Sequence, residues 1–173
     1  AFMTLRFLLA GSLLVVVAFS VERSLAVRRR DWLLMFAAGM VGTGLYQPLF
    51  LNGLSLTTAS NTALIIATSP VFVALINRFL GREVLSTRGW LGIALAFGGV
   101  FLVVEGGGGV SLGSKAFLGD MMILVGAFLW SLYAVLAAPL MHHYTPLRVT
   151  ALTTAIGAVP LVLLGLPTVA AMD

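Results

Sequence analysis

The sequence predicts an all-α, polytopic transmembrane helix bundle, and three observations carry this prediction. First, 60% of the 173 residues are hydrophobic and only 9% are charged, with a mean hydropathy of +1.10. A soluble domain of this size cannot hide so much apolar surface. Second, the hydrophobic residues form long runs, whereas the strands of a membrane barrel would alternate with a period of two. Third, the cations cluster in every second connection between the runs.

Six apolar segments are candidates for membrane spans, since a helix needs about 20 mostly apolar residues to cross the hydrocarbon core. They are residues 2–21, 32–54, 59–79, 89–104, 117–140 and 146–166. The fourth is the shortest, and the glycines that follow it can extend it. Because lipid admits only helices or closed barrels, each segment is predicted to be helical.

The charges predict the orientation of these spans. Eight of the ten cations fall on one side. They are Arg23, Arg28, Arg29 and Arg30 after the first span, Arg78 at the end of the third span with Arg82 and Arg88 beyond it, and Arg148 at the start of the sixth. The connection after the second span has no cation, and the one after the fourth has only Lys115. By the positive-inside rule the arginine-rich connections are cytoplasmic. The basic balance therefore indicates membrane topology, and we expect no nucleic-acid partner.

The only obvious linker is the sequence EGGGGVSLGSK, residues 105–115, which predicts a flexible connection on the outer face. It divides the chain into residues 1–105, a linker at 106–116, and residues 117–173. Residues 5–16 and 152–163 are weakly similar, although their spans run in opposite directions, which is typical of transporters built from inverted repeats. The chain begins inside an apolar run and ends just past another, so we expect it to be a fragment that lacks further spans.

Prolines interrupt the second and third spans. Pro70 has no N–H, so it frees the carbonyl of Ile66, and its ring bends the helix. In lipid that carbonyl must meet a hydroxyl, protein or a water-lined cavity, and the hydroxyls of Thr68 and Ser69 stand beside it. Pro48 repeats this pattern in the second span.

Pro48 is preceded by Tyr46 and Gln47. At about 1.5 Å per residue, Gln47 and Thr68 both lie roughly 10–14 Å from the outer ends of their spans. Paired interruptions at one depth indicate a transport site, while simple helix kinking is the alternative. Trp130 and Tyr133 lie near the middle of the fifth span, away from the interfaces where aromatic residues gather, so they either line the same cavity or pack between helices.

Ionisable residues inside a span would be functional candidates, yet all six acids lie at span ends or in connections. Glu83 lies just past the end of the third span, next to Arg82. We predict that it forms an ion pair at the membrane interface, and the alternative is that it acts as a gate residue. Arg6 lies about one turn inside the first span, where it either extends to the headgroups or pairs with an acidic group. Small residues predict close helix packing on one face of the fourth span, at Gly92, Ala96 and Gly99, and on one face of the second span, at Ala38 and Gly42. No catalytic constellation, metal site or cofactor motif is recognisable.

Several stretches resemble the EamA domain of the drug/metabolite transporter superfamily. They are RFLLAG at 6–11, GTGLYQPLFLNGLSLTTASNTALIIATSPVFVALINRFLGRE at 42–83, GWLGIALAFGGVFLV at 89–103 and GDMMILVGAFLWSLYAVLAAPL at 119–140. The Ser-Pro pair, followed by glutamate thirteen residues after the proline, is the most specific element. The resemblance implies ten spans in two inverted five-span repeats, of which this chain matches spans two to seven.

The resemblance implies a multi-pass inner or plasma membrane protein that exports small metabolites, such as amino acids or related amphipathic solutes, by alternating access. Its partners would be a small-molecule solute and the lipid bilayer, and it would be no enzyme. The predicted cavity residues are Tyr46, Gln47, Thr68, Ser69, Trp130 and Tyr133. A nucleotide-sugar or drug carrier of the same superfamily and a non-transporting membrane scaffold are the alternatives.

Overall fold

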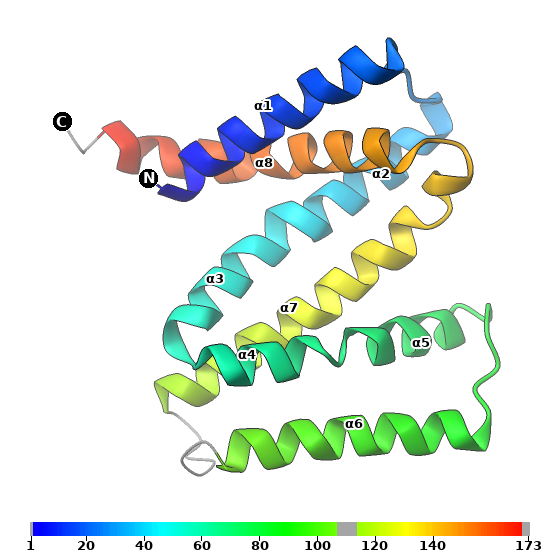
Figure 1. Ribbon diagram of the computed structural model, residues 1–173, viewed down its shortest axis with the longest axis vertical. Coiled ribbons are helices and arrows are strands. Elements are labelled where there is room, and N and C mark those ends of the chain that lie inside the picture. Colours follow the sequence, from blue (N-terminus) through cyan, green and yellow to red (C-terminus); the bar gives the residue numbers. More distant parts are fainter. Residues whose placement is uncertain (1, 107–113, 171–173) are drawn as a thin grey trace. The chain divides into compact units, whose positions relative to one another are not determined.

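The structure is a computed structural model that describes residues 2–106 and 114–170, and its described part contains helices and turns but no strand (Figure 1). The predicted all-α class is confirmed. The longer α-helices are α1 (Phe2–Glu22), α6 (Thr87–Gly106), α7 (Lys115–Ala137) and α8 (Pro146–Ala170). The shorter α-helices are α2 (Trp32–Gly39), α3 (Tyr46–Leu56), α4 (Ala59–Ile66) and α5 (Ser69–Phe79), and the other helical turns are η1 (Arg29–Asp31), η2 (Met40–Leu45) and η3 (Leu140–His142).

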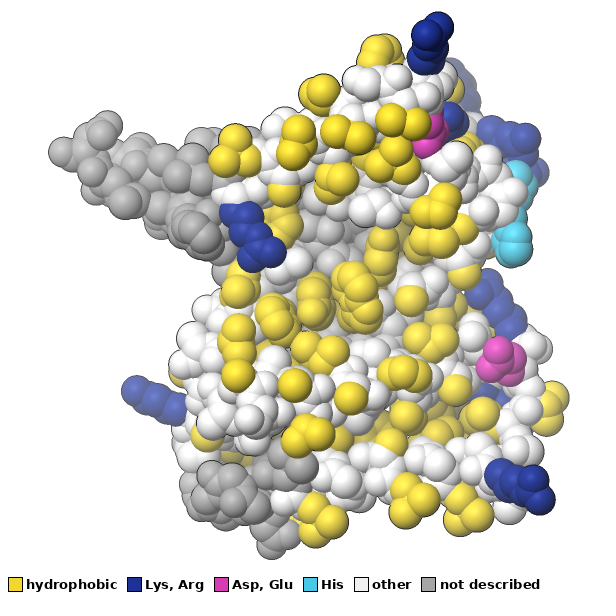
Figure 2. Space-filling model, in the orientation of Figure 1, with side chains coloured by type: hydrophobic (Ala, Val, Ile, Leu, Met, Phe, Trp, Pro, Cys, Tyr) yellow, Lys and Arg dark blue, Asp and Glu magenta, His cyan; other side chains and the backbone are white. Residues whose placement is uncertain are grey.

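Four helical segments in the described part are long and apolar enough to cross a membrane. They are Arg29–Leu56, Ala59–Phe79, Lys115–His142 and Pro146–Leu163, and two shorter apolar helices are Leu9–Glu22 and Thr87–Leu102. Large apolar side chains on these helices lie on the surface: Leu33 is 79% exposed and Leu95 is 76% exposed. Figure 2 shows such hydrophobic side chains across the visible face. This surface suits a lipid environment and would be costly in water.

The second predicted span is one helical run that changes its hydrogen-bonding pattern midway. Between α2 and α3 the six residues of η2 form a π-helix, in which Gly42, Thr43 and Gly44 are buried. Pro48 follows in the first turn of α3. In a regular helix the N–H of residue 48 would donate to the carbonyl of Gly44, but proline has no N–H. Short π-helical stretches are rare and frequently occur at functional sites.

The third predicted span is broken, as the proline predicted. Helix α4 ends at Ile66 and α5 begins at Ser69, with Pro70 in its first turn, where a proline disturbs a helix least. Residues 67 and 68 form the turn between the two helices. The predicted third span therefore consists of two short helices, α4 and α5.

The helices pack as two compact units. Unit 1 comprises Ala1–Leu45 with Leu136–Asp173, and unit 2 comprises Tyr46–Val135. These packing units cut across the second and fifth predicted spans, so they are not the sequence repeats expected on either side of the linker. The predicted repeat boundary stays a prediction, and most of the linker at 106–116 lies outside the described residues.

Within unit 1, α8 lies beside α1 and crosses α2 and η2 at very short range (Figure 1). Gly157 of α8 faces the backbone of Gly39 and Gly44, and a Cβ atom added to it would lie 2.3 Å from the carbonyl oxygen of Gly39. Small residues allow this approach because no side chain separates the backbones. Met35, Ala38 and Val149 are fully buried in the same unit.

Unit 2 contains a second close crossing, between α3 and α7. A Cβ atom on Gly119 would lie 2.9 Å from the carbonyl oxygen of Gly53. Ile65 of α4 and Ile123 of α7 are fully buried in this unit. In contrast, a Cβ atom on Gly92 or Gly99 of α6 would meet no other described atom within 4 Å, so the close packing predicted for that face is absent from the described residues.

Candidate functional site

An aromatic cluster joins α3 to α7 within unit 2. The ring of Tyr46 lies 5.2 Å from that of Trp130 and 5.5 Å from that of Phe50, and the rings of Trp130 and Tyr133 are 5.3 Å apart. These centroid distances are those of favourable aromatic pairs. Three of the six predicted cavity residues are therefore brought together. Phe50 joins them although it was not predicted, because the sequence alone does not show which face of α3 meets α7.

The polar tips of this cluster have no protein partner within the described residues. The hydroxyls of Tyr46 and Tyr133 and the indole N–H of Trp130 make no hydrogen bond there, and Trp130 is 44% exposed. Gln47 is partly buried and its amide likewise makes no hydrogen bond within the described chain. The cluster therefore offers ring faces and unused hydrogen-bonding groups on an otherwise apolar segment.

The break between α4 and α5 is satisfied locally. The hydroxyl of Ser69 donates a 2.7 Å hydrogen bond to the carbonyl of Ile66, which Pro70 leaves without its helical donor. The hydroxyl of Thr68 donates to the carbonyl of Ile65 at 2.6 Å. Both serve the backbone, so their oxygens keep only acceptor capacity for any other partner.

Ser131 of α7 holds the break in place. Its hydroxyl lies 2.8 Å from the carbonyl oxygen of Ser69 and 2.7 Å from that of Ala127, and its side chain is fully buried. The broken helix is thus tied to the residue next to Trp130. The sequence offered only one signal for Ser131, a hydroxyl near the middle of a long apolar span.

Thr68 also borders a small groove between α4 and α6. The groove has a volume of about 270 Å³ and is lined by Leu64, Ala67, Thr68, Leu95, Ala96, Gly99 and Val100. Thr68 is only 4% exposed. The structure therefore places Ser69 against α7 but Thr68 beside a groove that opens toward α6.

Of the predicted ionisable residues, Glu83 and Arg82 belong to unit 2 and Arg6 belongs to unit 1. Glu83 and Arg82 are exposed and follow Gly81, whose φ of +68° ends α5 in a left-handed turn. No ion pair within 4 Å involves either of them in the described part of the chain. Arg6 is exposed, and its guanidinium carbon lies 5.9 Å from the ring centroid of Phe7. The ion pair and the gate predicted for these three residues stay predictions.

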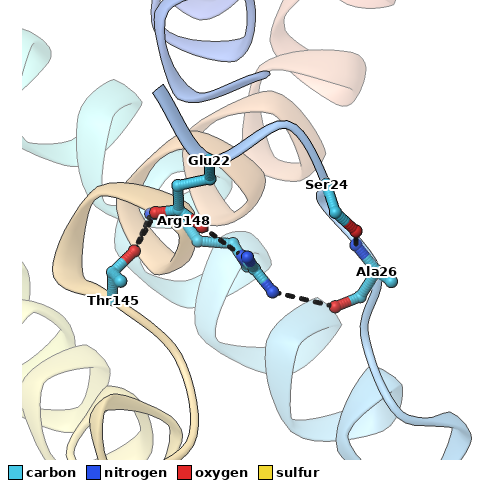
Figure 3. Close-up of polar contacts among 5 residues, drawn as sticks. All are labelled: Glu22, Ser24, Ala26, Thr145 and Arg148. Atoms are coloured by element: carbon cyan, nitrogen blue, oxygen red, sulfur yellow. Dashed lines mark hydrogen bonds and ion pairs between the residues drawn. The ribbon is translucent and has the colours of Figure 1, made fainter. Parts of the chain in front are cut away.

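A polar junction that the sequence did not predict joins α1 to α8 in unit 1 (Figure 3). Glu22 lies directly past the predicted first span, and its carboxylate accepts a hydrogen bond from the hydroxyl of Thr145 and a 2.5 Å bond from Nε of Arg148. Nη1 of Arg148 donates to the carbonyl of Ala26 at 3.3 Å. The hydrogen bond from Thr145 and the charge of Arg148 lower the pKa of Glu22, against an opposing effect of desolvation.

Tyr144 extends the junction to the start of α2. Its hydroxyl donates to Oδ2 of Asp31 at 2.7 Å and accepts a hydrogen bond from the backbone N–H of Arg28 at 3.0 Å. These contacts join residues more than 110 positions apart. A sequence pattern shows the charges at both places but not which of them meet.

A buried carboxylate lies near the beginning of α7 in unit 2. Asp120 is 2% exposed, and it accepts hydrogen bonds from the hydroxyl of Thr57 at 2.5 Å and from the amide of Asn61 at 3.4 Å. These bonds join the turn after α3, through Thr57, and the first turn of α4, through Asn61, to α7. Among the described residues, no group of three or more His, Cys, Asp or Glu could hold a metal ion.

Comparison with known proteins identifies the family. Residues 1–105, well over half of the chain, match the EamA-like transporter family. The chain belongs to this family. The resemblance drawn from its motifs is confirmed, and with its membrane-length helices this EamA-like chain is part of a multi-pass cell membrane protein.

Three curated relatives of this EamA-like chain carry the name of uncharacterized transporter. One from Archaeoglobus fulgidus is 33% identical over 157 residues, which cover 91% of this chain and 54% of that protein. YyaM of Bacillus subtilis is 31% identical over 92% of this chain and 52% of its own length. A protein of Methanothermobacter thermautotrophicus is 30% identical over 83% of this chain and 42% of its own length. The chain thus spans about half the length of these relatives, and no solved structure matches it.

Proposed function

We propose that the full-length protein transports small amphipathic metabolites, such as amino acids, out of the cell by alternating access, without catalysing a reaction. The aromatic cluster on α3 and α7 is the observation that carries this proposal. Family membership and the names of the relatives support transport in general. The chemistry of the cluster supports the class of solute.

The cluster combines two kinds of contact that an amphipathic solute needs. The rings of Tyr46, Trp130 and Tyr133 offer apolar faces, and their polar tips are free of protein partners in the described chain. Unused polar groups at membrane depth are costly unless they meet water or a ligand. A solute with an apolar body and a few hydrogen-bonding groups would satisfy both.

The nearby break gives the site a point at which the chain can bend. Residues 67 and 68 separate two short helices whose free carbonyls are already bonded by Thr68 and Ser69. A change of angle there would break few backbone hydrogen bonds. Discontinuous helices beside a substrate site are typical of alternating-access transporters.

Solute flux in liposomes that contain the purified full-length protein tests the proposal. A panel of radiolabelled amino acids, nucleotide sugars and cationic drugs would be offered, and Trp130→Phe would be compared with Trp90→Phe. Both tryptophans are about half exposed, at 44% and 49%, but Trp90 lies on α6 and has no ring contact with the cluster. Trp130→Phe removes the indole N–H and part of the ring surface, and it should reduce flux at least several-fold while Trp90→Phe leaves it unchanged.

The other readings give different results. Exchange of nucleotide sugars or flux of drugs, with none of amino acids, would favour the alternative carriers of the same superfamily. Absence of flux for the whole panel in a folded protein would favour a membrane scaffold. Equal effects of the two tryptophan variants would remove the cluster from the proposed site.

A further inference from the structure

Two connections on the predicted cytoplasmic side of unit 1 are joined into one surface. Residues 23–31 link α1 to α2, and residues 138–145 link α7 to α8. Tyr144 and Arg148 fasten the first connection through Asp31, Arg28 and Ala26. Arg23 has a φ of +54°, an uncommon value for a residue with a Cβ atom, and this left-handed residue turns the chain at the end of α1. The first connection is therefore a fixed loop.

The acids of this surface are already engaged. Glu22 is bonded by Thr145 and Arg148, and its side chain is only 8% exposed. Asp31 accepts the hydroxyl of Tyr144 and faces Arg30 at 3.6 Å, with a side chain that is 16% exposed. Neither carboxylate can neutralise the remaining arginines without leaving its present partners.

The basic side chains, in contrast, face outward. Arg23, Arg28, Arg29 and Arg30 are exposed on the first connection, and His142 and His143 are exposed on the second. Figure 2 shows basic and histidine side chains gathered over the α1–α2 and α7–α8 connections. The side chain of Arg30 is 70% exposed even though it approaches Asp31. This surface, which we term the arginine ledge, is defined as Arg23, Arg28, Arg29 and Arg30.

We propose that the arginine ledge binds the headgroups of anionic phospholipids in the cytoplasmic leaflet. The ledge directly follows a predicted span, so its side chains lie at headgroup level. Four or more cations next to a membrane span attract anionic lipid, and guanidinium groups match phosphate oxygens with paired hydrogen bonds. The fixed loop favours binding because the side chains lose less freedom than they would on a mobile loop. The inference rests on the predicted orientation and does not depend on which solute is transported.

The α5–α6 connection supplies a matched control within the same chain. It lies on the same predicted side, and three exposed arginines lie in it or at the helix ends that flank it: Arg78 near the end of α5, Arg82 in the connection and Arg88 at the start of α6. It differs in two respects, because Glu83 is exposed among these arginines and no described hydrogen bond ties this connection to a distant helix. Charge alone would predict equal lipid binding by both connections, whereas the proposal predicts binding at the ledge.

The experiment titrates the detergent-solubilised full-length protein with short-chain phosphatidylglycerol and follows its thermal-unfolding midpoint. Phosphatidylcholine of the same chain length and inorganic phosphate serve as comparison ligands. The ledge variant combines Arg28→Gln, Arg29→Gln and Arg30→Gln, and the control variant combines Arg78→Gln, Arg82→Gln and Arg88→Gln. A third variant replaces the three ledge arginines with lysine and so keeps the charge.

We expect phosphatidylglycerol to raise the midpoint of the unmodified protein and the concentration for half of that effect to rise roughly a hundredfold in the ledge variant. The control variant should stay within a few-fold of the unmodified protein. The lysine variant should fall between the unmodified protein and the ledge variant, because it keeps the charge but not the paired hydrogen bonds. If the triple ledge variant does not fold, Arg29→Gln alone should weaken the effect about fivefold.

Three results would overturn the proposal. They are an equal effect of the ledge and control variants, an equal response to phosphatidylcholine, and an equal response to inorganic phosphate. The measurement does not depend on solute flux. Lipid binding at the ledge can therefore be found in a protein that transports no solute, and it can be absent from a protein that does.

Discussion

Replacing Gly157 with alanine tests the close crossing of α8 with α2 and η2. The added Cβ atom would lie 2.3 Å from the carbonyl oxygen of Gly39, 2.4 Å from Cβ of Thr43 and 2.8 Å from the backbone nitrogen of Gly44. Favourable contacts between carbon atoms lie at about 3.5–4.0 Å, so the two helices would have to separate by about 1 Å. Two of the three atoms belong to the backbone and cannot rotate away.

The magnitude follows from two opposing effects. Overpacking of this kind typically costs about 1–3 kcal/mol, and the rigid partners place Gly157→Ala toward the upper end. Alanine is favoured over glycine inside a helix by about 1 kcal/mol, which offsets part of this cost. Gly92→Ala on α6 is the matched control, because its Cβ atom would meet nothing within 4 Å among the described residues. It should be neutral or stabilising by up to about 1 kcal/mol.

The assay is unfolding of the full-length protein in mixed micelles by titration with a denaturing detergent. Gly157→Ala should unfold earlier than the unmodified protein, and Gly92→Ala should unfold at the same point or later. Gly39→Ala should resemble Gly157→Ala, since its Cβ atom would lie 2.7 Å from the carbonyl oxygen of Thr153. The double variant should cost less than the two single costs combined, because one separation relieves both clashes. Identical curves for Gly157→Ala and Gly92→Ala would refute the crossing.

Three further predictions concern orientation, the junction and the break. A cysteine at Ser60 should react with an impermeant maleimide in intact cells while one at Ser86 is spared, and the reverse pattern would contradict the orientation. The pKa of Glu22 is lowered in the folded state, so its stabilising effect is present above the usual carboxyl range and lost as the pH falls through the lowered value. The difference in thermal stability between the unmodified protein and Glu22→Gln should therefore disappear at acidic pH, whereas a constant difference would contradict the ionic role. Pro70→Ala should restore a backbone donor, so stability should hold or rise while flux falls, and normal flux would make the proline a packing kink only.

The sequence predicted the features that depend on local chemistry. Long apolar runs predicted the six helical segments, and Pro70 predicted the break between α4 and α5. Both predictions succeed because they depend on local chemistry and not on neighbouring helices. The length of an apolar run favours a membrane helix, and a proline without an N–H breaks a helix, whatever packs nearby. The sequence pointed to Tyr46 because it lies beside Pro48, and to Trp130 because it lies near the middle of a span, and the two rings do meet.

The features that the sequence did not predict depend on which helices meet. The π-helix at η2 has no local signal beyond its glycines, and its buried residues pack against α8. Small residues occur on several spans, so the pattern favoured Gly92 on the fourth span as well as Ala38 and Gly42 on the second, and only the second-span residues are buried beside α8. Gly157, which makes the closest contact there, was not singled out by the pattern. Likewise, the sequence shows Arg148 only as one of the cations that predict the orientation of the spans. Its partner Glu22 lies 126 residues away, so the sequence does not show the ion pair.

The hydrogen bonds at the break indicate that Thr68 and Ser69 contribute less to solute binding than the aromatic residues of the predicted cavity. Thr68 and Ser69 were selected as hydroxyls that a solute could meet, but both donate to backbone carbonyls, and Thr68 is 4% exposed. Their remaining capacity is to accept a hydrogen bond, whereas Trp130 keeps its donor free among the described residues and is 44% exposed. Thr68→Val should therefore reduce flux less than Trp130→Phe does, with both measured in the same liposomes. A larger loss for Thr68→Val would place the solute in the groove between α4 and α6, away from the aromatic cluster.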